Sequence, residues 1–418
     1  MEQALKKCKL LILDRFSITM FKEETLFILG AGASCPYGYP LGKDLIQDII
    51  HNIKHDEIYI PMSETHIREH MANVSSHIAI NFTFSDLQAM LESTPIETFD
   101  QSGSEALRTL TSFKGTNYAT VQIGRIEEFH QLQIALTDFD PVSIDAFLSH
   151  HDKYALAGKI MIIYTLLKCE NKRYFTMRKK AKSGDKDEPE PDNWYSYLIN
   201  DILSGCNSPE DICENKLNII TFNYDVSLDY CLQNKLSNVG LLKNDRKAQE
   251  YIRTLTSSKI KHVYGKIYDD DPVENYGKFI PKSSSVTEIK AEIANNARRF
   301  LKAIQEKELI KLISPERKSE ELYKKLITDA KMIYIIGFGF DRDNLNMLGF
   351  SDNEIEWGGL FKEKGDRKLK YMDYDGRMKG LSDQIQFLKE KYKAKITKST
   401  SKLITNAYQN DFKISLFL

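Results

Sequence analysis

The sequence lacks the features that mark several specialised classes of protein. None of the six cysteines forms a C-x-x-C pair, so no zinc ribbon or disulfide framework is encoded by spacing. No apolar stretch reaches the roughly 18 residues that a membrane-spanning helix needs, and the N-terminal apolar run is too short for a signal peptide. The formal net charge of −1 gives no general attraction to nucleic acid or membranes. We therefore expect a cytoplasmic protein without a membrane anchor, a bound metal or direct nucleic-acid binding.

Short apolar runs that end in small or polar residues predict the main sheet. Such runs are typical of buried parallel strands, and their alternation with helical segments indicates an α/β fold with a doubly wound, Rossmann-like sheet. Ligands bind such sheets at the carboxyl ends of the strands. A last segment, 382–396, is predicted to pass from helix into strand. The predicted strands cover 26–29, 217–224, 261–265, 331–340 and, less clearly, 367–375.

A large helical insertion is expected between the first and second strands. We assign residues 1–60 and 211–418 to a discontinuous α/β domain, and 61–210 to the insertion. Within it, Ser143 or Asp145 is a start signal for a helix. An alternative is that Asp145 contributes to the functional site. The predicted helices cover 84–94 and 143–168, and a mobile, polar loop covers 181–193.

The first strand runs into a turn of small residues that is typical of a phosphate site. Glycines permit close backbone approach, and a helix beginning beyond the turn would direct its free N–H groups at an anion. The dinucleotide fingerprint G-x-G-x-x-G is incomplete because Cys35 occupies its third glycine position, and the P-loop signature is missing. An ordinary dehydrogenase is therefore disfavoured. The pyrophosphate-binding residues predicted here are Gly30, Ala31, Gly32 and Ser34.

Two further strand ends carry polar residues. The segment T-F-N-Y-D places Thr221, Asn223 and Asp225 at alternating positions that face one side of a strand. An alternative is that Asn223 and Asp225 cap the following helix. The segment K-H-V-Y-G places His262 and Tyr264 on one face of a short strand. A histidine with a pKa near neutrality is a possible general base, although a lone histidine is as often structural.

Together, these motifs resemble the sirtuin superfamily. Sirtuins carry, in order, G-A-G-x-S, G-x-P, T-Q-N-I-D and a His-Gly pair. The strand beginning at residue 333, with G-F-G-F and the sequence after it, resembles the family's strand beside adenosine. By this resemblance Thr221 and Tyr264 also line the nucleotide site, with Gly337, Gly339 and Asn344 at its adenosine end. The matching segments are Gly30–Ser34, Gly38–Pro40, Thr221–Asp225 and His262–Gly265.

Two departures from the sirtuin pattern direct the functional interpretation. The zinc ribbon of the deacylases is missing, and Tyr264 precedes the glycine where the family has histidine. The chain is more similar to the sirtuin-like NADase effectors of prokaryotic antiphage defence. That resemblance implies cleavage of NAD⁺ to nicotinamide and ADP-ribose in abortive infection. It also implies a homo-oligomer or a separate partner, such as a hexameric HerA-type ATPase. The sequence leaves open whether the product is linear ADP-ribose, from hydrolysis, or cyclic ADP-ribose.

The resemblance also implies roles for individual residues. Asn223 would position water or ribose hydroxyls, Asp225 would orient the nicotinamide carboxamide, and His262 would be the general base, in preference to Tyr264 because a phenol titrates near pH 10. NAD⁺ is the substrate in this interpretation, and no metal takes part. Two alternatives stay open. The first is a non-catalytic sensor or structural subunit that binds NAD⁺ or ADP-ribose, and the second is an NAD-dependent protein deacylase.

Overall fold

The computed structural model describes most of the α/β domain and part of the insertion. The predicted helix at 84–94 lies outside the described residues, as does the predicted loop at 181–193 apart from its last residue. The described residues are 21–62, 117–175, 193–277, 299–300, 302–304, 306–312, 321–339, 342–348, 368–372, 395–398 and 404.

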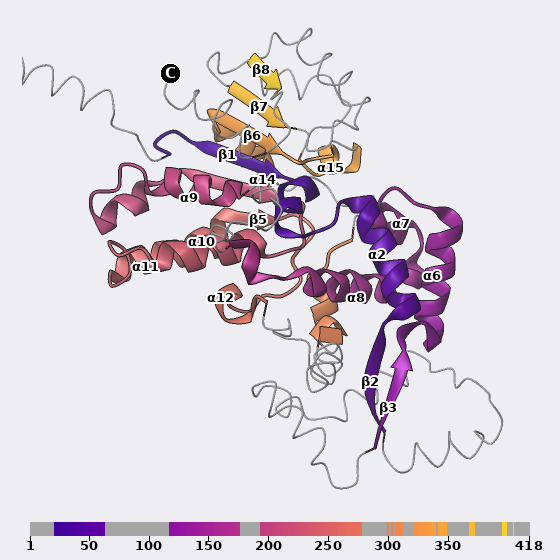
Figure 1. Cartoon of the computed structure of the whole chain (residues 1–418). Helices are drawn as coiled ribbons and strands as arrows, with labels where there is room; N and C mark the ends of the chain where they lie inside the picture. Colours follow the sequence, from indigo (N-terminus) through magenta and orange to yellow (C-terminus); the bar gives the residue numbers. More distant parts are fainter. Residues whose placement is uncertain are drawn as a thin grey trace, which may run out of the picture.

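Six parallel strands form the main sheet, in the order β5-β4-β1-β6-β7-β8 (Figure 1). Counted along the chain within the sheet, this order is 3-2-1-4-5-6, which is the order of dinucleotide-binding Rossmann sheets. The order reverses between β1 and β6, where such sheets bind their ligands. The strands are β1 Thr25–Leu29, β4 Leu217–Thr221, β5 Ile260–His262, β6 Met332–Ile336, β7 Lys368–Met372 and β8 Lys395–Lys398. The predicted α/β fold is confirmed.

Burial on both faces explains why the central strands are short apolar runs. Every residue of β1 and β6 is buried, as expected for a parallel sheet with helices on both sides. The strand register aligns Leu29 with Thr221 and with Ile336, and Thr221 with His262. The carboxyl ends of β1, β4, β5 and β6 therefore lie at one edge of the sheet.

A helical bundle lies beyond this edge. Helices α2 (Gly42–His55), α6 (Glu127–Phe139), α7 (Ile144–His150) and α8 (Asp152–Cys169) pack on one another there (Figure 1). The remaining α-helices are α9 Trp194–Leu203, α10 Ser227–Ser237, α11 Arg246–Thr254, α12 Pro272–Asn275, α14 Glu321–Asp329 and α15 Arg342–Met347. Short helices of other types cover Ala31–Ala33, Cys35–Tyr37, Ile123–Arg125, Lys172–Phe175, Pro209–Glu214, Leu255–Lys259 and Lys307–Leu309.

Two features of the insertion differ from the prediction. The single helix predicted at 143–168 is two helices that meet at His151, whose ring Nδ1 lies 2.8 Å from the Phe147 carbonyl oxygen that a continuous helix would use. The insertion also contains an antiparallel hairpin, in which β2 (Glu57–Met62) pairs with β3 (Asn117–Gln122). The segment after α2 therefore supplies no strand to the main sheet.

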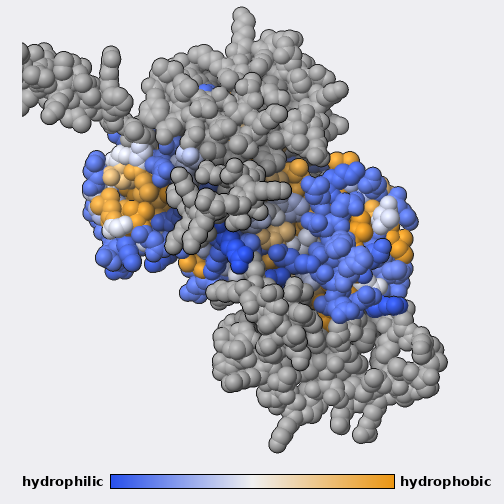
Figure 2. Space-filling model, viewed as in Figure 1, coloured by the Kyte–Doolittle hydropathy of each residue, from blue (hydrophilic) through white to orange (hydrophobic). Residues whose placement is uncertain are grey.

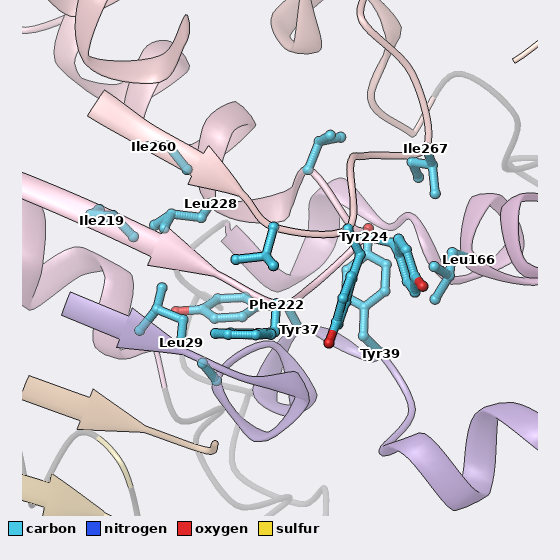
Figure 3. Close-up of a cluster of buried hydrophobic side chains, with 14 of the residues drawn as sticks. Leu29, Tyr37, Tyr39, Leu166, Ile219, Phe222, Tyr224, Leu228, Ile260 and Ile267 are labelled. Atoms are coloured by element: carbon cyan, nitrogen blue, oxygen red, sulfur yellow. The ribbon is translucent and has the colours of Figure 1, made fainter. Parts of the chain in front are cut away.

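The core is continuous from the sheet into the insertion. Tyr37 stacks on Tyr195 with ring centroids 3.9 Å apart, and both side chains are buried. Figure 3 shows Tyr37 in the buried cluster that also contains Phe222 and Tyr224. The visible described surface is mainly hydrophilic, with small apolar patches (Figure 2). Among the described residues, no helix combines the length and hydrophobicity needed to cross a membrane.

Candidate functional site

The glycine turn after β1 packs against the end of β6. The Gly30 N–H donates to the Ile336 carbonyl at 3.0 Å, and the Gly32 N–H donates to the Gly337 carbonyl at 3.0 Å. A Cβ atom on Gly30 would lie 2.5 Å from the Gly337 carbonyl oxygen, and one on Gly337 would lie 2.3 Å from the Ala33 nitrogen. Gly337 has φ of +60°, whereas Gly30 is extended at −119°. The close approach of two backbone segments therefore requires glycine at both positions.

Among the described residues, no α-helix begins directly beyond this turn. Two 3₁₀ helices follow, Ala31–Ala33 and Cys35–Tyr37, and the second carries a proline in its first turn and ends at Gly38 with φ of +87°. The long helix α2 begins only at Gly42. Because the N–H groups of residues 32–34 bond to backbone carbonyls, they are not open to an anion, and the pyrophosphate cradle stays a prediction. Any anion here would be bound by other groups of the turn.

The insertion covers the glycine turn through α9. The Trp194 Nε1–H donates to the Ala33 carbonyl at 2.9 Å, and the Tyr195 N–H donates to the Tyr37 hydroxyl at 2.8 Å. Trp194 and Tyr195 are both buried. The aromatic residues at the start of α9 are therefore internal packing that fixes the turn.

Asn223 lies at the centre of the strand ends. Its N–H donates to Thr221 Oγ1 at 3.1 Å, and its Nδ2 donates to Ser34 Oγ at 3.1 Å. Its Oδ1 is buried and makes no hydrogen bond to any described residue. Buried amide oxygens in native proteins are almost always paired, with protein, water or ligand. This free acceptor therefore points to a hydroxyl or amide donor that is not part of the described chain.

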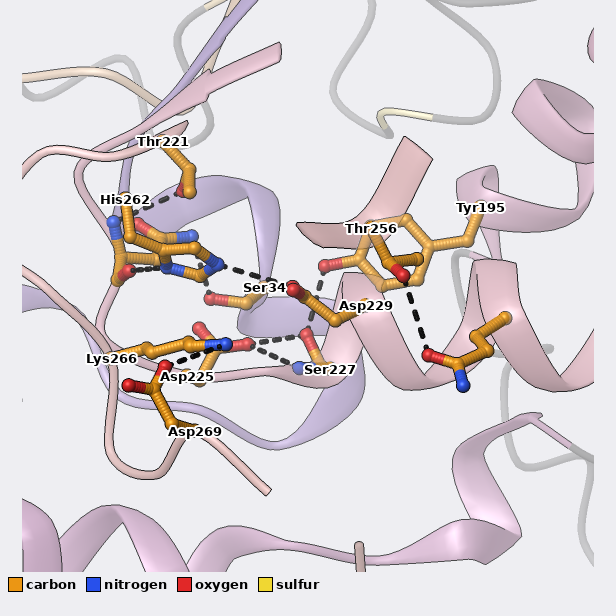
Figure 4. A network of polar contacts seen from close by, with 12 residues as sticks. Ser34, Tyr195, Thr221, Asp225, Ser227, Asp229, Thr256, His262, Lys266 and Asp269 are labelled. Carbon is orange, nitrogen blue, oxygen red and sulfur yellow. Dashed lines mark hydrogen bonds and ion pairs between the residues drawn. The ribbon is translucent and has the colours of Figure 1, made fainter. Parts of the chain in front are cut away.

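Asp225 forms a turn at the start of α10. Its Oδ1 accepts from the Ser227 N–H at 3.0 Å and from the Ser227 hydroxyl (Figure 4). Asp225 thus binds the first N–H of α10, but the N-cap residue is Val226, without a side-chain cap bond, and the Asn223 side chain bonds Ser34, so the alternative that both residues cap this helix is not confirmed. The Ser227 hydroxyl oxygen also lies 3.0 Å from that of Tyr195. Burial raises the pKa of Asp225, against the hydrogen bonds from Ser227 and Ser34 that favour the carboxylate. Asp225 therefore joins the turn, α9 and α10 in one polar network.

His262 uses both ring nitrogens. Nδ1 lies 2.9 Å from the Asn223 carbonyl oxygen, and Nε2 lies 3.2 Å from Asp229 Oδ2 (Figure 4). Burial disfavours a charged ring and is the largest single effect on its pKa. The charge and hydrogen bond of Asp229, together with the Asn223 carbonyl, outweigh it and raise the pKa of His262. Asp229 was not predicted from the sequence, although it lies four residues after Asp225 on the turn-and-helix segment that carries Asn223.

Tyr264 lies away from His262, although the sequence predicted a shared strand face. The strand ends at His262, and a turn follows in which the Gly265 N–H donates to the His262 carbonyl at 3.2 Å. The Tyr264 hydroxyl donates to Asn344 Oδ1. Its ring lies 5.5 Å from Phe222, measured between centroids. Tyr264 and Asn344, both predicted to line the nucleotide site, are therefore brought together.

A cavity of about 260 Å³ lies between α7 and α15. Asp145, Phe147, Asp343 and Asn344 are among the residues that line it. Asp145 does not cap α7, because Ser143 Oγ accepts from the Ala146 N–H at 3.3 Å and fills that position. Asp145 instead accepts from the Tyr224 hydroxyl. The insertion thus reaches the end of β4, and Asp145 lies within this cavity wall.

The predicted site residues form two neighbouring groups. The first group is the polar network of Ser34, Thr221, Asn223, Asp225 and His262. The second is Tyr264 and Asn344, which lie beside the cavity. Gly30 and Gly337 join the loops between the two groups, and Gly339, which follows Gly337, is half-buried. In the described part of the chain, no three His, Cys, Asp or Glu side chains gather as around a metal ion.

No protein-family model and no curated protein matches this chain. The functional assignment therefore rests on the strand order, the polar network and the unpaired Asn223 oxygen.

Proposed function

We propose that the protein is an NAD⁺ glycohydrolase, which cleaves the bond between nicotinamide and ribose to release nicotinamide and ADP-ribose. The observation that carries the proposal is the buried Asn223 Oδ1 without a partner among the described residues. It lies at the carboxyl edge of a sheet with the dinucleotide-binding strand order. The sequence motifs around it are those that resemble sirtuins.

Asn223 is suited to hold an O–H group. Its Nδ2 is used by Ser34 Oγ, so the side-chain amide cannot rotate freely, and its Oδ1 remains an acceptor. A ribose hydroxyl or the attacking water supplies the matching donor. Positioning a reactant in this way is a large contribution to many enzymatic rates.

The other residues would bind the rest of the dinucleotide. The Gly30–Ser34 turn would lie beside the pyrophosphate, and Tyr264 and Asn344 would lie toward adenosine. Asp225 would face the carboxamide of nicotinamide. Because nicotinamide leaves as a neutral molecule from a pyridinium, departure requires neither a general acid nor a metal. A carboxylate close to the developing positive charge on ribose lowers the barrier electrostatically.

We further propose that this activity serves as a toxic effector in antiphage defence, controlled by oligomerisation or a partner. This part of the proposal follows from the resemblance. Expression in bacteria tests it. Wild-type protein should lower cellular NAD⁺ during infection, and Asn223→Ala should not; equal NAD⁺ levels in the two strains would refute the effector role.

Product analysis separates hydrolysis from the two alternative functions. We expect purified protein and NAD⁺ to yield nicotinamide and ADP-ribose in equal amounts, as measured by chromatography. A deacylase would release nicotinamide only after addition of an acyl-lysine peptide. A sensor would bind NAD⁺ in calorimetry and return it intact, and either result would replace the glycohydrolase proposal.

A further inference from the structure

Three residues from three segments form a chain of contacts behind the candidate site. Asp229 on α10 contacts His262 at the end of β5, and His262 contacts the main chain of Asn223 after β4. The side chains of His262 and Asp229 are only 8% and 4% exposed. We propose that Asp229 and His262 form a buried ion pair at neutral pH that positions Asn223, and that His262 is a positioning residue and not the general base.

Hydrogen-bond chemistry defines the protonation state of the ring. A backbone carbonyl can only accept, so His262 Nδ1 must carry a proton to bond the Asn223 oxygen. An ionised carboxylate also only accepts, so with Asp229 ionised Nε2 carries a second proton. A ring with both protons is an imidazolium and has no lone pair for a substrate proton. The geometry thus removes the base function that the sequence motif suggested.

The charges that face the ring favour the same state. Asp229 from α10 and Asp225 from the turn before it are the carboxylates near the ring, and Lys266 from the segment after β5 is the nearby cation. The Lys266 ammonium lies 3.0 Å from Asp269 Oδ1, which balances its charge. Removing one member of a buried ion pair leaves an uncompensated charge. Asp229 and His262 are therefore expected to keep their charges together.

The ion pair completes the fixation of Asn223. Thr221 Oγ1 binds its N–H, Ser34 Oγ binds its Nδ2, and His262 Nδ1 binds its carbonyl. These bonds leave Oδ1 as the group directed at a ligand. Displacement of a positioned group by about 1 Å can cost about 100-fold in rate. Asp229, which lies behind His262, thus acts on the site through two other residues.

The kinetic test rests on the proposed NAD⁺ hydrolysis. It asks whether the rate of that reaction rises or falls with increasing pH. A general base would give rates that rise as the pH passes the His262 pKa. A positioning imidazolium gives the opposite, a loss of kcat above that pKa. In Asp229→Asn the alkaline loss should move to lower pH, because the neutral amide stabilises the imidazolium less. A rate that rises with pH in wild type would overturn the proposal.

Two substitutions at His262 distinguish a positioning role from a general-base role. In His262→Asn the side-chain Nδ2 occupies the place of Nδ1 and keeps a donor for the Asn223 carbonyl. We expect His262→Ala to lose about 100-fold in turnover and His262→Asn to lose clearly less, because only the asparagine keeps the bond to the Asn223 carbonyl. Loss of a general base would instead lower both variants by a similar factor of about 100 or more.

A measurement without substrate keeps the ion pair testable if NAD⁺ is not consumed. Nitrogen-15 NMR of wild-type protein at pH 7 should show both nitrogens of His262 protonated, assigned by the signals missing in His262→Asn. The Asn223 side-chain amide signal should shift when His262 titrates at higher pH. A neutral His262 ring at pH 7 would refute the proposal, whereas an imidazolium with no NAD⁺ turnover at any pH would refute only the proposed function.

Discussion

Gly30 and Gly337 pack backbone to backbone at the point where the strand order reverses, with the Gly337 carbonyl 2.5 Å from where a Gly30 Cβ would lie. Their loops follow β1 and β6, which are neighbours in the sheet. A Cβ on either residue would therefore meet main-chain atoms of the other loop. This contact fixes the turn that leads to Ser34, so it supports the site as well as the fold.

Alanine at either glycine should destabilise the protein strongly. We expect Gly30→Ala and Gly337→Ala each to lower the free energy of unfolding by about 3 kcal/mol, because main-chain neighbours cannot move aside as side chains do. Gly337 carries the additional strain of its φ of +60°. Urea denaturation measures the loss. Gly240→Ala is the control, since nothing lies within 4 Å of that position; equal stability of all three variants would contradict the packing explanation.

The Tyr224–Asp145 hydrogen bond should stabilise the attachment of the insertion to the sheet. Bonds to a charged acceptor contribute about 2 kcal/mol, so Tyr224→Phe should lower the free energy of unfolding by that amount. Tyr154→Phe, which keeps its ring contact with Phe147, is the control. A double-mutant cycle with Asp145→Asn should show that the two losses are not additive. Additive losses would mean that the two side chains do not act together.

Trp194 should connect the insertion to nucleotide binding. Trp194→Phe removes the donor to the Ala33 carbonyl and leaves that buried oxygen without its partner, at a cost of about 2 kcal/mol. Because the turn then loses its support, we expect weaker NAD⁺ binding in calorimetry as well as lower stability. A variant that is less stable but binds NAD⁺ as tightly as wild type would show that α9 supports the fold alone.

Glu170 should make stability decrease with rising pH. Burial raises its pKa from 4.5 to about 7, although its carboxylate accepts from the Gly277 N–H. An acid with a raised pKa binds more protons in the folded state, so folding weakens as the pH rises from about 4.5 through 7.

We therefore expect wild type to lose about 2 kcal/mol of stability between pH 5 and pH 8 through this group. Glu170→Gln keeps an acceptor for Gly277 and should remove that part of the decline, as measured by thermal unfolding across the range. Glu214→Gln, at an exposed carboxylate, should not change it. An identical decline in wild type and Glu170→Gln would show that Glu170 does not titrate in this window.

The strands could be predicted because each buried strand appears in the sequence as one short run of apolar residues. The five buried residues of β1, and those of β6, are short apolar runs that end in glycine or polar residues. The strand order depends on which runs pair, and no single run encodes this. The β2–β3 pairing was missed because its partners are more than 50 residues apart and because Pro61 interrupts the strand pattern of β2.

The site could be predicted only in part. Asn223 and Asp225 follow a strong strand signal, so their position at the sheet edge was expected. The role proposed for His262 depends on its contact with Asp229, and nothing in the sequence distinguishes this acid from other acids on helices. Because β5 ends at His262, Tyr264 contacts Asn344 and does not share a strand face with His262. A strand of three residues is too short for the alternation of its side chains to predict where it ends.

Nicotinamide release from NAD⁺ by wild type and Asn223→Ala, measured side by side, tests the proposed role of the free Asn223 oxygen most directly. We predict steady release by wild type and a loss of about 100-fold or more in the variant, with both proteins unfolding at similar temperatures. Equal release by the two proteins would contradict the assignment of Asn223, and no release by folded wild type that binds NAD⁺ would contradict the glycohydrolase.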